Sequence, residues 1–156
     1  MSDHGEVLTP TLEEARRRRA DIHQALVAVE EAISGPAVGR EEEWAREVIE
    51  KLGVLREVIE EHIEVTERAE GLYDEILHKA PRLAGPIQRL KDEHPLLRDG
   101  ASELIAKLRM SPVGTVWSVD EARDDVQRLL GRIVKHRQHG ADLIWEAYNL
   151  DIGGVD

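Results

Sequence analysis

The chain has seven histidines and no cysteine, and four of the histidines lie in four different stretches of helical periodicity. These residues are His23, His62, His94 and His136. At least three of them fall where the apolar stripe of their helix is expected. A buried polar group without a partner costs roughly 1–3 kcal/mol, so these imidazoles need partners. Imidazole nitrogens bind transition-metal ions, and four such side chains that converge in one bundle could satisfy one another around a metal.

The elements that must position these histidines are helices, because apolar residues recur at spacings of three and four along most of the chain. Thr11 with Glu14, and Ser118 with Glu121, have the spacing of capping boxes that begin helices. Pro95, next to His94, is expected to kink its helix. The pattern predicts an all-α fold, an antiparallel up-down four-helix bundle over residues 11–149 with tails at 1–10 and 150–156. The expected helices span residues 12–34, 41–71, 87–108 and 119–148, with a short helical piece at 72–79.

Composition limits the function classes. A net charge of −11 argues against a general nucleic-acid-binding surface. No apolar run reaches the roughly 18 residues of a membrane span, and the first residues lack the pattern of a secretion signal. We therefore expect a cytoplasmic protein. It is expected to be a monomer or a homodimer, with Trp117 and Trp145 as exposed aromatics that could form a dimer face.

Several of these features together resemble the hemerythrin-like, or HHE cation-binding, family. They are the four histidines, the phrase Asp92-Glu93-His94 and the stretch from His139 to Gly154. The resemblance covers most of the chain. It implies a four-helix bundle that usually holds two non-heme irons. Members of that family use the irons to bind oxygen, to sense oxygen, nitric oxide or iron, or for peroxide and nitric oxide chemistry.

The chain departs from the family's ligand pattern at two positions. In that pattern a carboxylate follows a histidine by four residues on the second and fourth helices. Here Thr66 follows His62 and Gly140 follows His136, so both iron-bridging carboxylates are replaced. Neutral imidazoles alone suit one zinc, iron, copper or nickel ion better than a pair. The space left could admit water, an anion or a small diatomic ligand, or could be filled by a side chain such as Arg98.

The resulting prediction is a mononuclear site in which His62, His94 and His136 bind non-heme iron or zinc, with His23 or water as a fourth ligand. His23 lies 11 residues before its helix ends, and His62 lies 21 residues into the next helix. At about 1.5 Å per residue, tightly joined antiparallel helices would set them roughly 15 Å apart in height. Another alignment places the family's first ligand at Arg19, which would remove that ligand.

Two further residues complete the candidate metal set, namely Glu67 and His139. Glu67 is one residue beyond the expected position, about 140° around the helix from His62. His139 lies three residues after His136, on the same side of its helix.

Three functions remain open. The first is a metal-binding bundle that binds or senses oxygen, nitric oxide or metal. The second is a metal-free four-helix bundle that serves as an interaction or small-ligand-binding module, with its histidines satisfied by carboxylates such as Glu93. The third is an enzyme that uses a histidine-bound metal with an open position, for which the sequence names no substrate.

Overall fold

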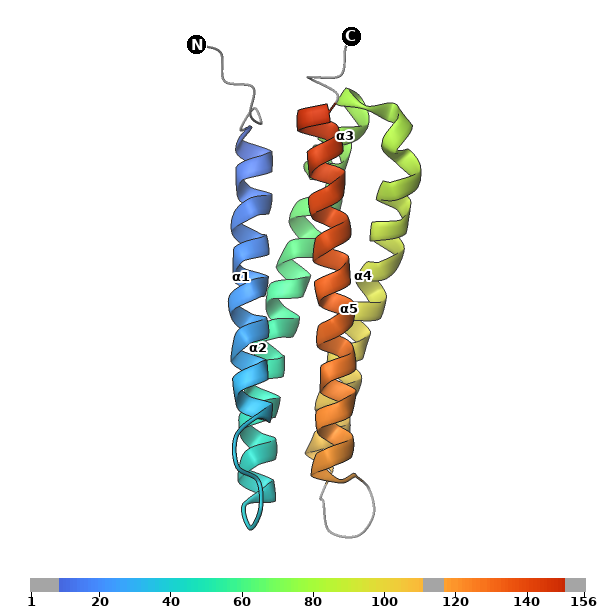
Figure 1. Cartoon of the computed structure of the whole chain (residues 1–156). Coiled ribbons are helices and arrows are strands. Elements are labelled where there is room, and N and C mark those ends of the chain that lie inside the picture. Colours follow the sequence, from blue (N-terminus) through green and yellow to red (C-terminus); the bar gives the residue numbers. More distant parts are fainter. Residues whose placement is uncertain (1–8, 111–116, 151–156) are drawn as a thin grey trace.

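A computed structural model describes residues 9–110 and 117–150, and these residues form an all-α bundle of four long helices (Figure 1). The predicted four-helix bundle is confirmed. Followed along the chain in Figure 1, α1 and α4 run in one direction and α2 and α5 run in the other. The long helices are α1 (Pro10–Ile33), α2 (Glu41–Glu67), α4 (Ala84–Arg109) and α5 (Val119–Trp145).

A short helical connection joins α2 to α4 at one end of the bundle. It consists of α3 (Leu72–Lys79) and the 3-10 turn η1 (Pro81–Leu83). Gly71 precedes α3 at a close approach of the backbone: a Cβ there would lie 2.8 Å from the carbonyl oxygens of Val65 and Arg68. The turn after α2 therefore needs a residue without a Cβ at position 71. The carboxylate of Glu75 accepts hydrogen bonds from the hydroxyls of Thr9 and Tyr148, and so ties α3 to α1 and to the end of the chain's last helix.

The helix ends differ from the predictions at several points: α2 ends at Glu67 rather than near Gly71, and α5 ends at Trp145, where a π turn continues it. The N-cap of α1 is Thr9, whose Oγ1 accepts from the backbone N–H of Leu12 at 3.0 Å; the prediction that Thr11 caps the helix and that the tail extends to residue 10 is wrong. The reason is Pro10, whose fixed φ and missing N–H suit the first helical position. Ser118 caps α5 as predicted, accepting from the N–H of Glu121 at 3.1 Å. Residues 1–8 and 151–156 of the predicted tails lie outside the described residues.

The later helices hold two further local features. Pro95 lies inside α4, which continues through it without interruption. Beyond α5 the chain continues as one π-helical turn, η2 (Glu146–Leu150). In the part of the chain that the structure describes, no helix has both the length and the apolar character needed to cross a membrane.

The buried side chains form two apolar clusters stacked along the bundle. The larger one holds Ile22, Ile59, Leu97 and Ile133 at its upper limit. The smaller one holds Ala15, Leu90 and Leu143 together with the buried residues of α3, which are Leu72, Tyr73 and Ile76. Between these two clusters, α2, α4 and α5 each have a level where the inward position is not hydrophobic. His62, His94 and His136 lie at that level on α2, α4 and α5.

Trp117 is buried rather than exposed. Its ring lies 6.1 Å from the ring of Trp44, its exposed fraction is 5%, and its Nε1 donates to the carbonyl of Met110. The prediction of an exposed Trp117 on a dimer face is therefore wrong, because this residue precedes the N-cap of α5 and closes the end of the core. Trp145 is exposed, as predicted.

Arg123 on α5 stabilises the end of α1. Its Nε and Nη2 donate to the carbonyl oxygens of Ile33 and Gly35 at 2.8 and 2.9 Å, and its guanidinium lies 5.6 Å from the ring centre of Trp44. The Arg123→Met variant leaves two helix-end carbonyls without these donors. We expect it to lower the free energy of unfolding by about 1–3 kcal/mol, measured by urea denaturation.

The matched control is Arg132→Met, at an exposed arginine of the same helix. It should change the free energy of unfolding by less than about 0.5 kcal/mol. Equal effects at the two positions would show that the contact with α1 does not stabilise the bundle.

Candidate metal centre

Three of the four predicted histidines converge. His62, His94 and His136 are 7%, 1% and 4% exposed, and one ring nitrogen from each lies within 4.8 Å of the others. The Nε2 atoms of His62 and His136 are 3.4 Å apart. Each histidine replaces an apolar residue at a spacing of three or four along its helix, for example three residues after Ile59 or Ile133. Regular helical geometry therefore directs all three rings to the bundle axis.

Two of the three imidazoles are held by carboxylates on their outer nitrogen. Nδ1 of His94 is hydrogen-bonded to Glu67, which lies near the end of α2. Nδ1 of His136 is 2.6 Å from Oε1 of Glu93, one residue before His94 on α4. A carboxylate that accepts from Nδ1–H leaves the lone pair on Nε2, and the same arrangement orients metal-binding histidines in proteins generally.

His62 has no such partner. Its Nδ1 is buried and, within residues 9–110 and 117–150, has no hydrogen-bond partner. Nε2 of His62 faces Nε2 of His136. When His136 donates through Nδ1 to Glu93, its Nε2 carries a lone pair and can accept. A metal ion between these nitrogens would be bound by both lone pairs.

The cluster is neutral at pH 7. Burial lowers the pKa of His62 well below its ordinary value, and the neighbouring histidines and Arg19 lower it further. Burial also lowers the pKa of His94, to about 3, and lowers the pKa of His136 against the opposing effect of Glu93. Neutral imidazole is the form that binds metal ions.

Tyr73 on α3 also reaches the cluster. Its hydroxyl is 3.4 Å from Nε2 of His94, and the two rings stack at 6.0 Å with an angle of 13° between them. Burial raises the pKa of Tyr73, so the phenol keeps its proton and is a donor rather than a phenolate ligand. Sequence reasoning missed Tyr73, because nothing in the spacing of α3 relates it to a histidine on α4.

His23 does not join the cluster. It is exposed on α1, so the prediction that it converges with the other three is wrong. The inward positions of α1 at this level are Ala15 and Ile22, and a residue directly after Ile22 is rotated by about 100° toward solvent. Arg19, the position favoured by the alternative alignment, acts electrostatically on His62.

The two further candidates lie at the edge of the cluster. Glu67 bonds His94 and is not among the three residues whose ligand atoms converge. His139 is 54% exposed, and its Nδ1 lies 3.4 Å from the second carboxylate oxygen of Glu93. Both therefore occupy outer positions around the histidines.

Space lies beside Thr66 and Gly140, the two positions where the resemblance led us to expect it. The Thr66 hydroxyl turns back to donate to the carbonyl of His62 at 2.8 Å, and a Cβ on Gly140 would meet nothing within 4 Å. A small cavity here gives the centre of a water-sized molecule about 20 Å³. Arg98 does not fill it and pairs instead with Asp99 at 3.2 Å. The cavity is lined by Ala15, Arg19, His62, Thr66, Leu72, Tyr73, His136, Arg137, Gly140, Leu143 and Ile144.

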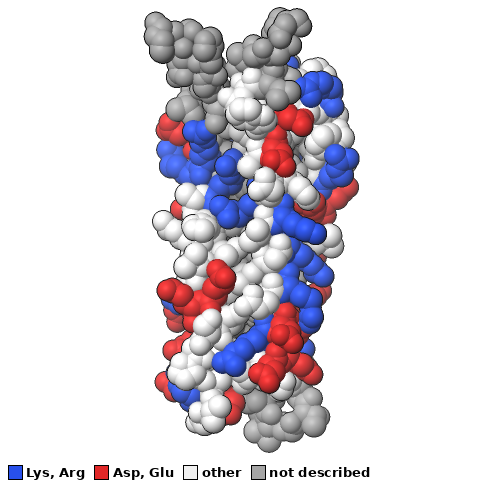
Figure 2. All heavy atoms as spheres, in the orientation of Figure 1, with Lys and Arg blue, Asp and Glu red and all other residues white. Residues whose placement is uncertain are grey.

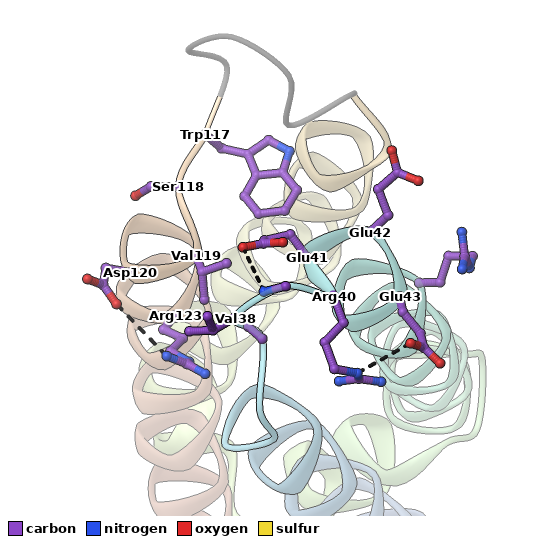
Figure 3. Close-up of a pocket in the computed structure, with 13 residues that line it drawn as sticks. Val38, Arg40, Glu41, Glu42, Glu43, Trp117, Ser118, Val119, Asp120 and Arg123 are labelled. Atoms are coloured by element: carbon purple, nitrogen blue, oxygen red, sulfur yellow. Dashed lines mark hydrogen bonds and ion pairs between the residues drawn. The ribbon is translucent and has the colours of Figure 1, made fainter.

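A larger hollow lies at the opposite end of the bundle, between the loop after α1 and the start of α5 (Figure 3). Its volume is about 900 Å³, and Trp117 and Val119 lie along one side. Four of the charged side chains in it are paired, Arg40 with Glu43 at 3.3 Å and Arg123 with Asp120 at 3.9 Å. Within the described residues it brings together no set of metal ligands, so the histidine cluster is the candidate site.

Comparisons of the chain with models of known protein families, with curated proteins and with solved structures gave no match. The resemblance to the hemerythrin-like family therefore stays a prediction from the sequence motifs.

The lowered histidine pKa values imply that stability depends on pH. Between about pH 6.5, the value for an unfolded histidine, and pH 3 the unfolded chain binds more protons than the folded one. We expect the metal-free protein to lose stability as the pH falls from 7 to 5, by up to about 1.4 kcal/mol per pH unit for each such histidine. Urea denaturation at a series of pH values measures this slope.

The His94→Gln variant should have a smaller slope than the parent protein, because one proton-binding site of the unfolded chain is removed. His78→Gln, at an exposed histidine of α3, is the control. A slope unchanged by His94→Gln would contradict the assignment of the pH dependence to this cluster.

Proposed function

We propose that the chain is a metal-binding protein in which His62, His94 and His136 hold one divalent transition-metal ion and leave a position open for a small ligand. The observation that carries this proposal is the orientation of the rings. Ring nitrogens of all three histidines converge within 4.8 Å, while Glu67 and Glu93 hold the Nδ1 atoms of two of them. Nε2 of His62 and Nε2 of His136 face each other at 3.4 Å, a separation at which one ion can contact both nitrogens.

The donor set indicates the kind of ion. Imidazole nitrogens favour zinc or ferrous iron, whereas magnesium and calcium prefer oxygen ligands. Three histidines with a fourth position for water or substrate are a known arrangement of zinc sites with open coordination. The two outer carboxylates offset the charge of one divalent ion. In the described residues the converging group contains no carboxylate that could bridge a second ion, which favours one ion.

The open position suggests the role. We propose that the ion binds a small ligand reversibly, as a carrier or sensor of oxygen, nitric oxide or the metal itself, in line with the family that the sequence resembles. Tyr73 lies beside the cluster and would donate a hydrogen bond to such a ligand. The competing proposal is a metal-free interaction module, in which Nε2–H of His62 would donate to Nε2 of His136 at 3.4 Å.

Metal content tests the proposal. Protein purified without a histidine tag should hold about one zinc or iron per chain by elemental analysis. His94→Ala and His136→Ala should lose most of it, and His23→Ala, at the exposed histidine of α1, should retain it. Two irons per chain would contradict a mononuclear site. No metal, even after incubation with Fe(II) and Zn(II), would contradict the proposal and favour the metal-free bundle.

The outer carboxylates give a second prediction. Glu93→Gln keeps the size of the side chain but weakens the acceptor for Nδ1–H of His136, so we expect metal affinity to fall by roughly 10- to 100-fold. Competition with a coloured chelator measures the affinity. Glu103→Gln, at an exposed position of the same helix, is the control. An affinity unchanged by Glu93→Gln would show that this carboxylate does not support a metal ligand.

A further inference from the structure

The cavity beside the histidine cluster is lined by two arginines, Arg19 from α1 and Arg137 from α5. We infer that the open position of the proposed metal site takes a small monovalent anion, held by these two guanidinium groups. This inference rests on the proposed metal site and specifies the chemical class of its ligand.

The charges around the cavity carry the inference. Arginine remains protonated at any physiological pH. Arg19 and Arg137 both line the cavity beside His62, and Nε of Arg137 is buried without a hydrogen-bond partner in the described part of the chain. Among the described residues no Asp or Glu lines the cavity, because Glu67 and Glu93 lie outside it. A divalent ion beside two guanidinium groups would lack a neighbouring negative charge on this side, and an anion supplies it.

The size of the cavity limits the anion. About 20 Å³ is available to the centre of a water-sized molecule, and a single water needs roughly 10–15 Å³. Hydroxide, a halide or a diatomic anion fits this space, whereas sulfate does not. Much of the remaining wall is apolar, formed by residues such as Leu72, Leu143 and Ile144. An apolar wall strengthens the attraction between the anion and the charges around it.

Neutral donors complete the lining. If His62 binds the metal through Nε2, its Nδ1 carries the proton and needs an acceptor, which the structure otherwise lacks within the described residues. Tyr73 retains its proton, since burial raises its pKa. Both residues line the cavity, so an anion there would accept hydrogen bonds as well as pair with the arginines.

The surface over the cavity is basic although the chain as a whole is acidic. Figure 2 shows Lys and Arg side chains gathered along α1 and α5 in the upper half of this face. The first half of α1 carries four consecutive arginines at 16–19, and the second half of α5 carries Lys135 and Arg137. A local basic surface raises the concentration of anions near the cavity.

Chloride binding to the cobalt-loaded protein tests the inference. Co(II) replaces zinc in sites of this kind, and its visible absorption changes when an anion enters its coordination. Elemental analysis first establishes about one cobalt per chain, and chloride is then titrated at constant ionic strength against sulfate. We expect a saturable spectral change in the parent protein. The apparent dissociation constant should rise at least tenfold in Arg137→Gln and in Arg19→Gln, and less in Arg137→Lys.

Arg132→Gln, at an exposed arginine of α5 that does not line the cavity, should behave as the parent protein does. Cobalt bound with no response to chloride, or a response that Arg137→Gln and Arg137→Lys leave unchanged, would overturn the anion site and leave the metal site standing. Failure to bind cobalt would overturn the metal site, and the anion inference with it. If Arg137→Gln does not fold, the comparison of Arg19→Gln and Arg137→Lys with Arg132→Gln decides.

Discussion

The structure depends on how three imidazoles are kept in the middle of an apolar core. His62, His94 and His136 lie between two hydrophobic clusters, at a level where each of α2, α4 and α5 would otherwise place an apolar residue. Burial makes their charged forms unfavourable, so they are neutral and each can offer one donor and one acceptor nitrogen. Carboxylates from α2 and α4 accept two of the donors, and the acceptors are left facing one another. Without metal, His62 can carry its proton on Nε2 and donate to Nε2 of His136 at 3.4 Å, and a cation bound between the two nitrogens would replace that contact.

The fold and most of the cluster could be predicted from the sequence, because both follow from helical periodicity. His62, His94 and His136 continue apolar stripes at spacings of three and four, which fixes the face of the helix on which each lies. His23 shows the limit of this reasoning. It directly follows the buried Ile22 on α1, and the step of one residue turns it to solvent. Whether a histidine joins the cluster therefore depends on its position relative to the apolar residues of its helix, and the presence of one histidine in each helix does not decide it.

The supporting residues could not be predicted, because their contacts join different helices. Glu67 lies about 140° around α2 from His62, which excludes it as a partner of that residue but says nothing of His94 on α4. Whether a carboxylate at the end of one helix reaches a ring on another depends on the rotation and height of both. The same holds for Tyr73, and for Arg19 and Arg137, which enter one cavity from helices at opposite ends of the sequence.

Thr66 and Gly140 stand where the pattern of the family that the sequence resembles has carboxylates, and this difference has two effects that reinforce each other. The two residues supply no negative charge that would hold two cations together, and they line a cavity whose charged residues are cationic rather than anionic. The negative charge that remains near the histidines, on Glu67 and Glu93, acts on their outer nitrogens and strengthens them as donors to a metal without occupying its coordination. Because these two carboxylates lie on the outer side of the histidines, the charge of a single bound ion would be little compensated on the side of the cavity. We therefore expect the open position of the proposed metal site to bind anions in preference to neutral diatomic ligands, since the two arginines favour negative charge there.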